Sequence, residues 1–289
     1  MHDISINLAG IKMQNPVMVA SGTFGYGDEY AELMDINRLG ALVTKTITIK
    51  PRAGNPPPRI IETPAGMLNS IGLQNVGLQS FISDKLPQLK KISPPIIVSI
   101  SGETVQEFIQ LAEVLSAQTG IAGLEMNLSC PNVKAGGLLF SIDTKLTNEV
   151  VAAVKRVTTL PILVKLTPNV TDITVIGKSA EDAGADALVA INTLLGMVID
   201  IKTGKPKLGN ITGGLSGPAI RPIAVRMVYE LAKKVKIPIV GTGGIMNTSD
   251  ALEFLYAGAT AVSIGTGLFV DPLIPIKIID GLSKSRHTI

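Results

Sequence analysis

The feature that most constrains the fold of this chain is a regular alternation of short apolar segments with longer amphipathic ones. Eight short segments rich in β-branched residues are predicted to be strands: Val17–Ala20, Ala41–Thr44, Ile96–Ile100, Gly123–Leu128, Ile162–Lys165, Ala187–Ile191, Ile237–Val240 and Ala261–Ile264. Segments with helical periodicity lie between several of them: Val105–Ala117, Asn148–Val157, Asp172–Ala183, Ala219–Lys234 and Ser249–Ala257. Strands that are apolar on both faces and separated by helices are typical of a parallel sheet covered on both sides.

Two arrangements fit this alternation, a closed (β/α)8 barrel and an open doubly wound sheet. The chain has 289 residues, of which 46% are apolar and 17% charged, enough for one large α/β core. We expect a single barrel domain over residues 1–289, with long insertions after the second and sixth strands at Ile47–Gln79 and Thr193–Gly217. In a barrel, loops that follow strands lie on the catalytic face, so both insertions are expected to cover the substrate.

Composition excludes several classes of function. A net charge of +3, 3% aromatic residues and no Trp argue against a nucleic-acid-binding surface. The single cysteine excludes an internal disulfide, is typical of a reducing cytoplasm, and is too few to hold an iron–sulfur cluster. The N-terminus shows no signal peptide, and no apolar stretch is long enough to span a bilayer. The two histidines, His2 and His287, lie at the termini, so other groups must do any acid–base work.

The residues at the predicted carboxyl ends of the strands are amides, hydroxyls, glycines, two lysines and one thiol. They are Ser21, Gly22, Lys45, Thr46, Ser99, Asn127, Ser129, Cys130, Lys165, Asn192, Thr193, Gly243, Gly244, Gly265 and Thr266. This set contains no carboxylate, whereas a glycosidase needs a pair of them and a Mg²⁺ site needs at least one. The pattern therefore favours an anionic ligand rich in hydrogen-bonding groups and predicts no metal.

Glycine-rich turns follow the seventh and eighth strands, as GTGG at Gly241–Gly244 and IGTG at Ile264–Gly267. The loops after these two strands are the usual phosphate site of a (β/α)8 barrel, because backbone N–H groups there approach the ligand closely. Tight turns without a ligand are the alternative, and a phosphate site alone does not fix the reaction. The first strand is followed by SGTFGYG, whose spacing does not match the Rossmann fingerprint, so a nicotinamide site of that type is not expected.

Three kinds of strand-end residue are candidates for chemistry. Cys130 precedes Pro131 in a polar segment. A thiol has an ordinary pKa of about 8.5, and Cys130 is the best placed general base in the chain. The alternative is that a lone cysteine is only a buried apolar residue. Lys45 and Lys165 suit either a fixed cation facing an anion or a Schiff-base lysine of an aldolase. Asn69, Asn127, Asn192 and Thr193 suit a planar ring with amide groups and a carboxylate, or a capping role in turns.

Nine sequence blocks taken together resemble the dihydroorotate dehydrogenase family. They occur in order from Ser21 to Pro272: SGTFG, TKT, NSIGLQN, NLSCPNVKAGG, VKLTPN, INT, GGLSGPA, GTGG and IGTG. The cysteine in NLSCPN resembles the class whose base is a cysteine, and NVKAGG resembles the NAD-linked class 1B rather than the fumarate-linked class 1A.

The resemblance implies oxidation of dihydroorotate to orotate in pyrimidine biosynthesis, with Cys130 removing a proton from C5 while hydride passes from C6 to flavin mononucleotide (FMN). It implies that substrate is bound by Lys45, Asn69, Ser70, Ile71, Gly72, Leu73, Asn127, Asn192 and Thr193. It implies that FMN is bound by Ser21, Lys45, Thr46, Ser99, Asn127, Lys165, Ile191, Gly217, Gly243, Gly244, Gly265 and Thr266. Position 99 is Ser where relatives often have Asn, which puts that contact in doubt.

The resemblance also implies a partner subunit that holds FAD and a 2Fe–2S cluster and passes electrons to NAD, in a heterotetramer with two copies of each chain. The lone cysteine and the missing Rossmann fingerprint fit an iron–sulfur cluster and an NAD site that belong to another subunit. The fumarate-linked homodimer, a lysine-dependent barrel aldolase or lyase, and a flavin-binding protein without catalysis remain as alternatives at this point.

Overall fold

A computed structural model describes residues 2–128 and 140–285 and shows a closed parallel barrel. Its strands, in chain order, are β3 (Val17–Val19), β4 (Ala41–Val43), β7 (Ile96–Ile100), β8 (Gly123–Asn127), β9 (Ile162–Lys165), β10 (Ala187–Ala190), β13 (Ile239–Thr242) and β14 (Ala261–Ile264). The last strand pairs with the first, since Val262 lies opposite Val17. This closure confirms the barrel and excludes the open doubly wound sheet. Each predicted strand is present, and most bounds differ by one residue or none.

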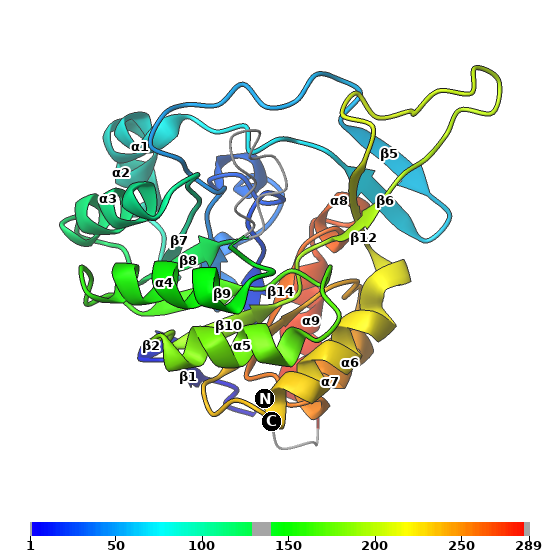
Figure 1. The fold of residues 1–289 in the computed structure, drawn as a ribbon. Helices are drawn as coiled ribbons and strands as arrows, with labels where there is room; N and C mark the ends of the chain where they lie inside the picture. The colour runs from blue at the N-terminus through cyan, green and yellow to red at the C-terminus, as the bar shows by residue number, and fades with distance from the viewer. Residues whose placement is uncertain (1, 129–139, 286–289) are drawn as a thin grey trace.

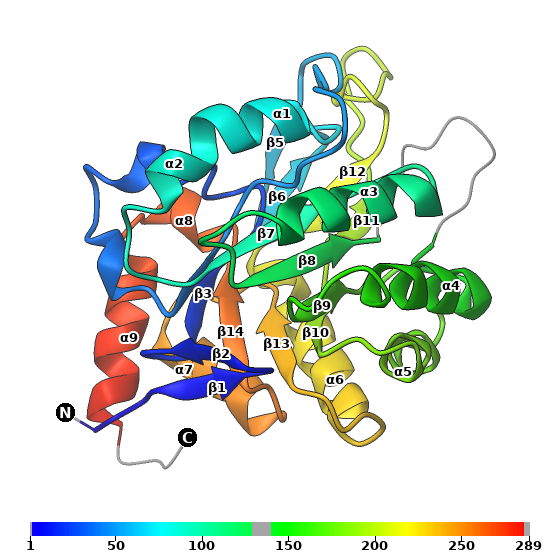
Figure 2. The same ribbon diagram turned by 90° about the vertical axis from the view of Figure 1, so that its left-hand side faces the viewer.

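Helices surround the barrel (Figure 2). Five match the predicted segments: α3 (Val105–Ser116), α4 (Thr144–Lys155), α5 (Ile173–Asp182), α6 (Arg221–Ala232) and α7 (Thr248–Tyr256). Four of these helices have an N-cap residue whose side chain accepts a hydrogen bond from a backbone N–H of the first turn. The N-cap residues are Thr104, Asp143, Asp172 and Asn247. The sequence analysis did not predict α1 (Gly77–Ser80), the π-helical turn η3 (Phe81–Lys85), α2 (Leu86–Leu89), α8 (Gly267–Val270) or α9 (Ile274–Lys284).

The first strand-to-strand connection departs from the repeating pattern. Between β3 and β4 it contains only the short 3-10 turns η1 (Asp28–Tyr30) and η2 (Ile36–Arg38). Buried Phe24 and Tyr30 stack here with ring centroids 4.4 Å apart, so aromatic packing covers this sector of the barrel in place of a longer helix.

The two predicted insertions pair with each other in a four-stranded antiparallel sheet. The sheet has the order β11 (Leu194–Gly196), β12 (Gly213–Ser216), β6 (Gly66–Asn69) and β5 (Ile60–Thr63). The pairing of Asn69 with Gly214 joins segments that lie far apart in the sequence. Figure 1 shows this sheet, with the loop between β11 and β12, projecting from one side of the barrel as an arm.

The opposite end of the barrel is closed by a hairpin of β1 (Ile6–Leu8) and β2 (Ile11–Met13). Buried Leu8, Ile11 and Met13 belong to one apolar cluster with side chains of the barrel strands, including Met18 and Leu163. A larger cluster fills the space between strands and helices. The backbone N–H of His2 donates to the carbonyl of Ser283, so the first and last parts of the described chain lie side by side. Within the described ranges, no helix has the length and apolar character needed to cross a membrane.

Candidate functional site

A large cavity of about 620 Å³ lies at the carboxyl end of the barrel strands, between the barrel and the small sheet. Its volume falls within the range of about 300–1,000 Å³ that is typical of cofactor and ligand sites. Residues from barrel strand ends and from both insertions line it. The insertions therefore contribute to the walls of the site, as the sequence predicted.

Almost all of the predicted site residues meet at this cavity. Its lining includes Ser21, Lys45, Thr46, Asn69, Ser70, Ile71, Gly72, Leu73, Asn127, Lys165, Ile191, Asn192, Thr193, Gly217, Gly243, Gly244, Gly265 and Thr266. Ser99 is the exception among the described residues, because it is fully buried and does not line the cavity. Cys130, the predicted base, lies outside the described residues.

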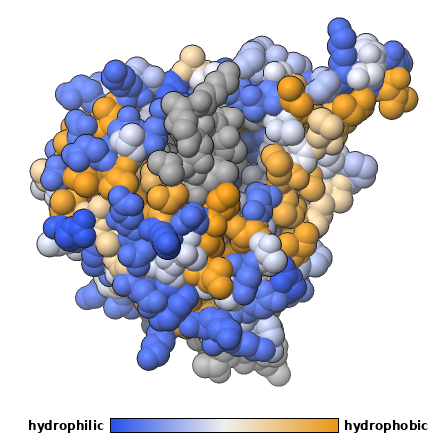
Figure 3. All heavy atoms as spheres, viewed as in Figure 1, coloured by the Kyte–Doolittle hydropathy of each residue, from blue (hydrophilic) through white to orange (hydrophobic). Residues whose placement is uncertain are grey.

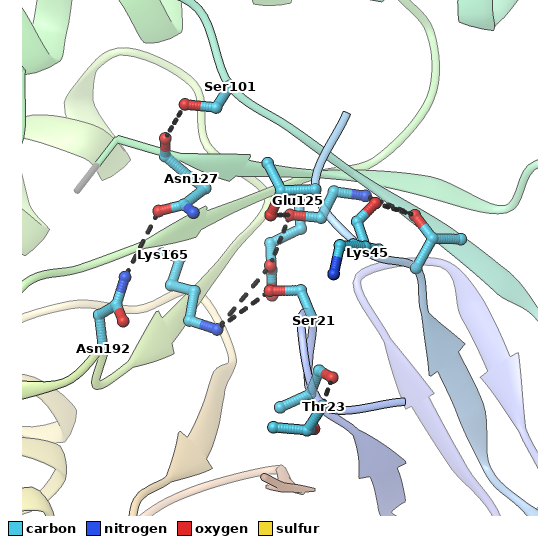
Figure 4. A network of polar contacts seen from close by, with 12 residues as sticks. Ser21, Thr23, Lys45, Ser101, Glu125, Asn127, Lys165 and Asn192 are labelled. Atoms are coloured by element: carbon cyan, nitrogen blue, oxygen red, sulfur yellow. Dashed lines mark hydrogen bonds and ion pairs between the residues drawn. The ribbon is translucent and has the colours of Figure 1, made fainter. Parts of the chain in front are cut away.

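The floor of the cavity contains a buried ion pair that the sequence analysis missed (Figure 4). Nζ of Lys165 lies 3.9 Å from Oε1 of Glu125 and 3.4 Å from Oγ of Ser21. Glu125 was overlooked because only residues at strand ends were considered. Side chains alternate along a strand, so Glu125 lies on the same face of β8 as Asn127, and this period of two is the signal that predicts its inward position.

Ser99, which was predicted to contact the cofactor, contacts neighbouring side chains in the structure. The Ser99 hydroxyl donates to Oε1 of Glu125 at 3.0 Å and is 2.9 Å from Oγ1 of Thr46. A serine side chain ends closer to the backbone than an asparagine side chain does, so it remains in the layer below the cavity. Thr46 does line the cavity and connects the two layers.

Amide side chains form one wall. Nδ2 of Asn192 lies 3.4 Å from Oδ1 of Asn127, and the backbone N–H of Thr193 donates to Oδ1 of Asn192 at 2.8 Å. Asn169, which the sequence analysis did not select, donates to the carbonyl of Thr193 at 3.1 Å and also lines the cavity. Such a wall offers donors and acceptors in fixed directions to a ring that carries amide groups.

The segment Asn69–Asn75 forms a second wall after β6. Asn75 fixes its far end, because its amide donates to the Thr48 hydroxyl at 2.9 Å and to the carbonyl of Leu73 at 2.7 Å. Its Oδ1 accepts the backbone N–H groups of Thr48 and Gly77. Leu73 adopts a φ of 54°, in the left-handed region. The loop is therefore held by hydrogen bonds within it and to Thr48, and several of its residues line the cavity.

The glycine-rich turns form the third part of the site. A Cβ placed on Gly265 would meet only Ala20 at 3.7 Å and Thr23 at 4.0 Å, so packing within the protein does not require glycine there. The space in front of this backbone belongs to the cavity, as expected where a ligand approaches closely. The turn after β13 is braced from behind by the buried carboxylate of Asp250, which accepts the backbone N–H of Met246 at 2.9 Å and pairs with Arg221.

The charge of the cavity suits an anion. None of the described lining residues is Asp or Glu, whereas Lys45 and Lys165 both reach it. Burial lowers the pKa of Lys45 below its ordinary 10.5, the carboxylate of Glu29 opposes this shift, and the positive charge of Arg59 adds to it. Lys45 thus presents a partly desolvated ammonium, which attracts an anion more strongly than a solvated one.

Comparison with known proteins identifies a family. The family model described as dihydroorotate dehydrogenase matches residues 3–285. The chain is 57% identical over 270 residues to the protein named dihydroorotate dehydrogenase B (NAD+), catalytic subunit, of Citrifermentans bemidjiense, covering 93% of this chain and 88% of that one. It is 54% identical over 280 residues to the protein of the same name from Geotalea uraniireducens, covering 97% and 92%.

A solved structure has the same fold. The crystal structure of DHODH from Eimeria tenella in complex with ferulenol aligns with a TM-score of 0.79 at 23% identity, covering 97% of this chain and 83% of that one.

Proposed function

The chain belongs to the dihydroorotate dehydrogenase family, and on that premise we propose that it is the catalytic subunit of an NAD-linked enzyme that oxidises (S)-dihydroorotate to orotate in de novo pyrimidine biosynthesis. The observation that supports this most directly is one continuous cavity lined by the glycine-rich turns, two lysines and the amide wall. Such a cavity accommodates a phosphorylated cofactor and a small anion side by side.

The residues present fit FMN. The open backbone at Gly265, together with Gly243, Gly244 and Thr266, offers N–H groups to a phosphate, and the short helix α8 begins directly after Thr266. Lys165, Thr46 and Asn127 would hold the ring, with the ammonium of Lys165 stabilising negative charge on it. When bound, FMN supplies the hydride acceptor that none of the twenty ordinary side chains provides.

The substrate is a small ring with amide groups and a carboxylate, and the remaining walls match it. Lys45 would face the carboxylate, and the amides of Asn69, Asn127 and Asn192 would exchange hydrogen bonds with the ring. Asn69 is already oriented by its bond to the carbonyl of Gly214 at 3.3 Å. Binding of this kind fixes the ring relative to the cofactor and excludes water from the reacting atoms.

We assign the base to Cys130, which follows β8 in the sequence and lies outside the described residues. Proton removal from a carbon needs a group that is close to the substrate and partly ionised near neutral pH. His2 and His287 are far from this part of the sequence, and the described lining of the cavity has no carboxylate. The thiol therefore remains the candidate that best fits the reaction.

Electrons must leave the reduced cofactor for the enzyme to turn over again. The relatives are named as the catalytic subunit of an NAD+-linked enzyme, and this name supports a separate electron-transfer subunit. We propose that this partner holds FAD and a 2Fe–2S cluster and that two copies of each chain form a heterotetramer. One cysteine in 289 residues is too few to hold such a cluster on this chain. Exposed apolar side chains on the arm, among them Leu195, Met197 and Ile201, are consistent with assembly, and Figure 3 shows apolar surface on that side of the molecule.

The test begins with the purified chain alone. It is expected to be yellow, to release FMN on denaturation, and to reduce an artificial dye with dihydroorotate but not to reduce NAD. Adding the electron-transfer subunit should then establish NAD reduction. A colourless protein that cannot be reconstituted with FMN would contradict the proposal. Efficient NAD reduction by the single chain would contradict the need for a partner subunit. Efficient fumarate reduction would assign the chain to the homodimeric class instead.

A further inference from the structure

Glu125 is a charged residue that the proposed reaction does not use, and it lies directly beneath the cavity. Its side chain is 2% exposed, and that of Lys165 is 8% exposed. Burying a carboxylate is costly unless hydrogen bonds and an opposite charge compensate it. Within the described part of the chain, Lys165 is the only cation that pairs with Glu125, so each of these buried charges depends on the other.

The hydroxyl groups around Glu125 have only one consistent orientation when it is ionised. A carboxylate only accepts hydrogen bonds, so Ser99 must give its one proton to Glu125. The contact between Ser99 and Thr46 is then donated by Thr46. Thr46 has no further proton to offer, and its oxygen can only accept from a group inside the cavity.

The separation of the ion pair is also informative. At 3.9 Å the ammonium of Lys165 does not form a close hydrogen bond to Glu125, and it extends instead towards Ser21 at the cavity wall (Figure 4). The carboxylate thus offsets the charge of Lys165 without a close hydrogen bond, and Lys165 remains part of the cavity lining. A tighter pair would use the N–H donors of the lysine within the floor.

We propose that Glu125 is a positioning residue that holds the ammonium of Lys165 directed at the flavin ring, and that it fixes Thr46 as an acceptor through Ser99. This inference rests on the proposed function, because it assumes that FMN occupies the cavity. It does not involve Glu125 touching cofactor or substrate, since Glu125 does not line the cavity.

The experiment measures the midpoint potential of FMN bound to the full-length chain, by reduction in the presence of a reference dye. Without its counter-charge, the buried ammonium of Lys165 turns away from the ring, and negative charge on the reduced ring is less stabilised. Glu125→Gln should therefore lower the potential, and Lys165→Gln should lower it as well. We expect at least a tenfold change in the ratio of reduced to oxidised cofactor, about 30 mV for a two-electron couple.

Two further variants separate positioning from other roles. Glu125→Asp keeps the charge and should restore most of the potential. In the Lys165→Gln background, Glu125→Gln should change the ratio by less than about threefold, because the residue through which it acts is already lost. A wild-type potential in Glu125→Gln, a rise in its potential, or an undiminished effect in the Lys165→Gln background would each overturn the proposal.

Loss of folding in Glu125→Gln would not leave the question open. The double variant with Lys165→Gln removes both buried charges, so recovery of a folded chain supports the pairing and continued failure counts against it. The outcome is also separable from the proposed function. A wild-type chain that binds no FMN, or whose FMN is not reduced by dihydroorotate, contradicts that function, whereas a normal wild type with an unaffected Glu125→Gln contradicts this inference alone.

Discussion

Lys45 lies at the carboxyl end of β4, partly desolvated in the cavity, and its burial lowers its pKa from 10.5. Only the protonated form attracts an anion, so affinity for orotate should begin to fall with rising pH below the pH expected for an ordinary lysine. Orotate dissociation constants, measured from the flavin absorbance between pH 7 and 11, would show this. Lys45→Arg is the matched variant, because guanidinium stays charged and should remove the alkaline fall. Equal pH profiles for the two proteins would refute the role of Lys45.

The same shift affects stability. Because the folded chain holds the Lys45 proton less tightly than the unfolded chain does, the unfolded state binds more protons between the lowered pKa and 10.5. The contribution of this residue to the free energy of unfolding therefore rises with pH through that window and is least favourable below it.

Cys130 gives the sharpest test of the chemical step. Cys130→Ala should keep FMN bound and lower the rate of flavin reduction by dihydroorotate on the order of 10²-fold or more, as loss of a positioned base does. Stopped-flow absorbance measures this rate without any partner subunit. Cys130→Ser should retain part of the rate and gain at high pH, because a hydroxyl is a poorer base. Near-normal reduction by Cys130→Ala would mean that another group removes the proton.

Residue types at strand ends predicted the cavity lining well, because a barrel brings all carboxyl ends of its strands to one face. Glu125 and Ser99 mark where that reasoning stopped. Both side chains lie one layer below the strand ends. A list of strand-end residues therefore left out Glu125 and included Ser99, which does not line the cavity. Which layer a side chain occupies depends on how the strands pack around the barrel, and the sequence of one strand does not contain that information.

At the scale of elements, the turn after β14 contains a glycine that the fold does not require but that the bound cofactor is expected to require. Gly265 has room for a methyl group as far as the protein is concerned. Gly265→Ala should therefore leave the free energy of unfolding of the flavin-free chain unchanged or raise it slightly. The methyl group would stand in the cavity, and overpacking of about 1–3 kcal/mol corresponds to about tenfold to hundredfold weaker FMN binding. Titration of the flavin-free chain with FMN measures the change, and unchanged affinity would place the phosphate elsewhere.

The elements themselves were predictable to different degrees. The eight barrel strands are predominantly apolar and buried on both faces, and their pattern predicts strands clearly. The strands of the small sheet are three or four residues long, rich in glycine, and without clear alternation, as in Gly213–Ser216. Their pairing depends on contacts between segments more than a hundred residues apart, such as Asn69 with Gly214. Local periodicity does not report such contacts.

At the scale of the whole molecule, the barrel separates its functional end from its closed end. The cavity, the glycine-rich turns and the small sheet occupy the carboxyl ends of the strands, while the β1–β2 hairpin closes the other end with apolar side chains. In barrels of this kind, residues at the closed end serve stability and those at the open end serve function. The two properties should therefore respond to different substitutions.

Leu8 tests that separation directly. It is fully buried in the cluster that closes the barrel, and Leu8→Ala removes three methyl-sized groups from tight packing. The free energy of unfolding in urea should fall by about 2–5 kcal/mol, whereas Lys12→Ala on the exposed face of the same hairpin should change it by no more than about 0.5 kcal/mol. At temperatures well below unfolding, both variants should keep the FMN affinity and flavin potential of the wild type, because the cavity lies at the opposite end of the strands. If Leu8→Ala weakened FMN binding while the chain stayed folded, the closed end would be coupled to the site through the strands, and the division of roles along the barrel axis would be wrong for this protein.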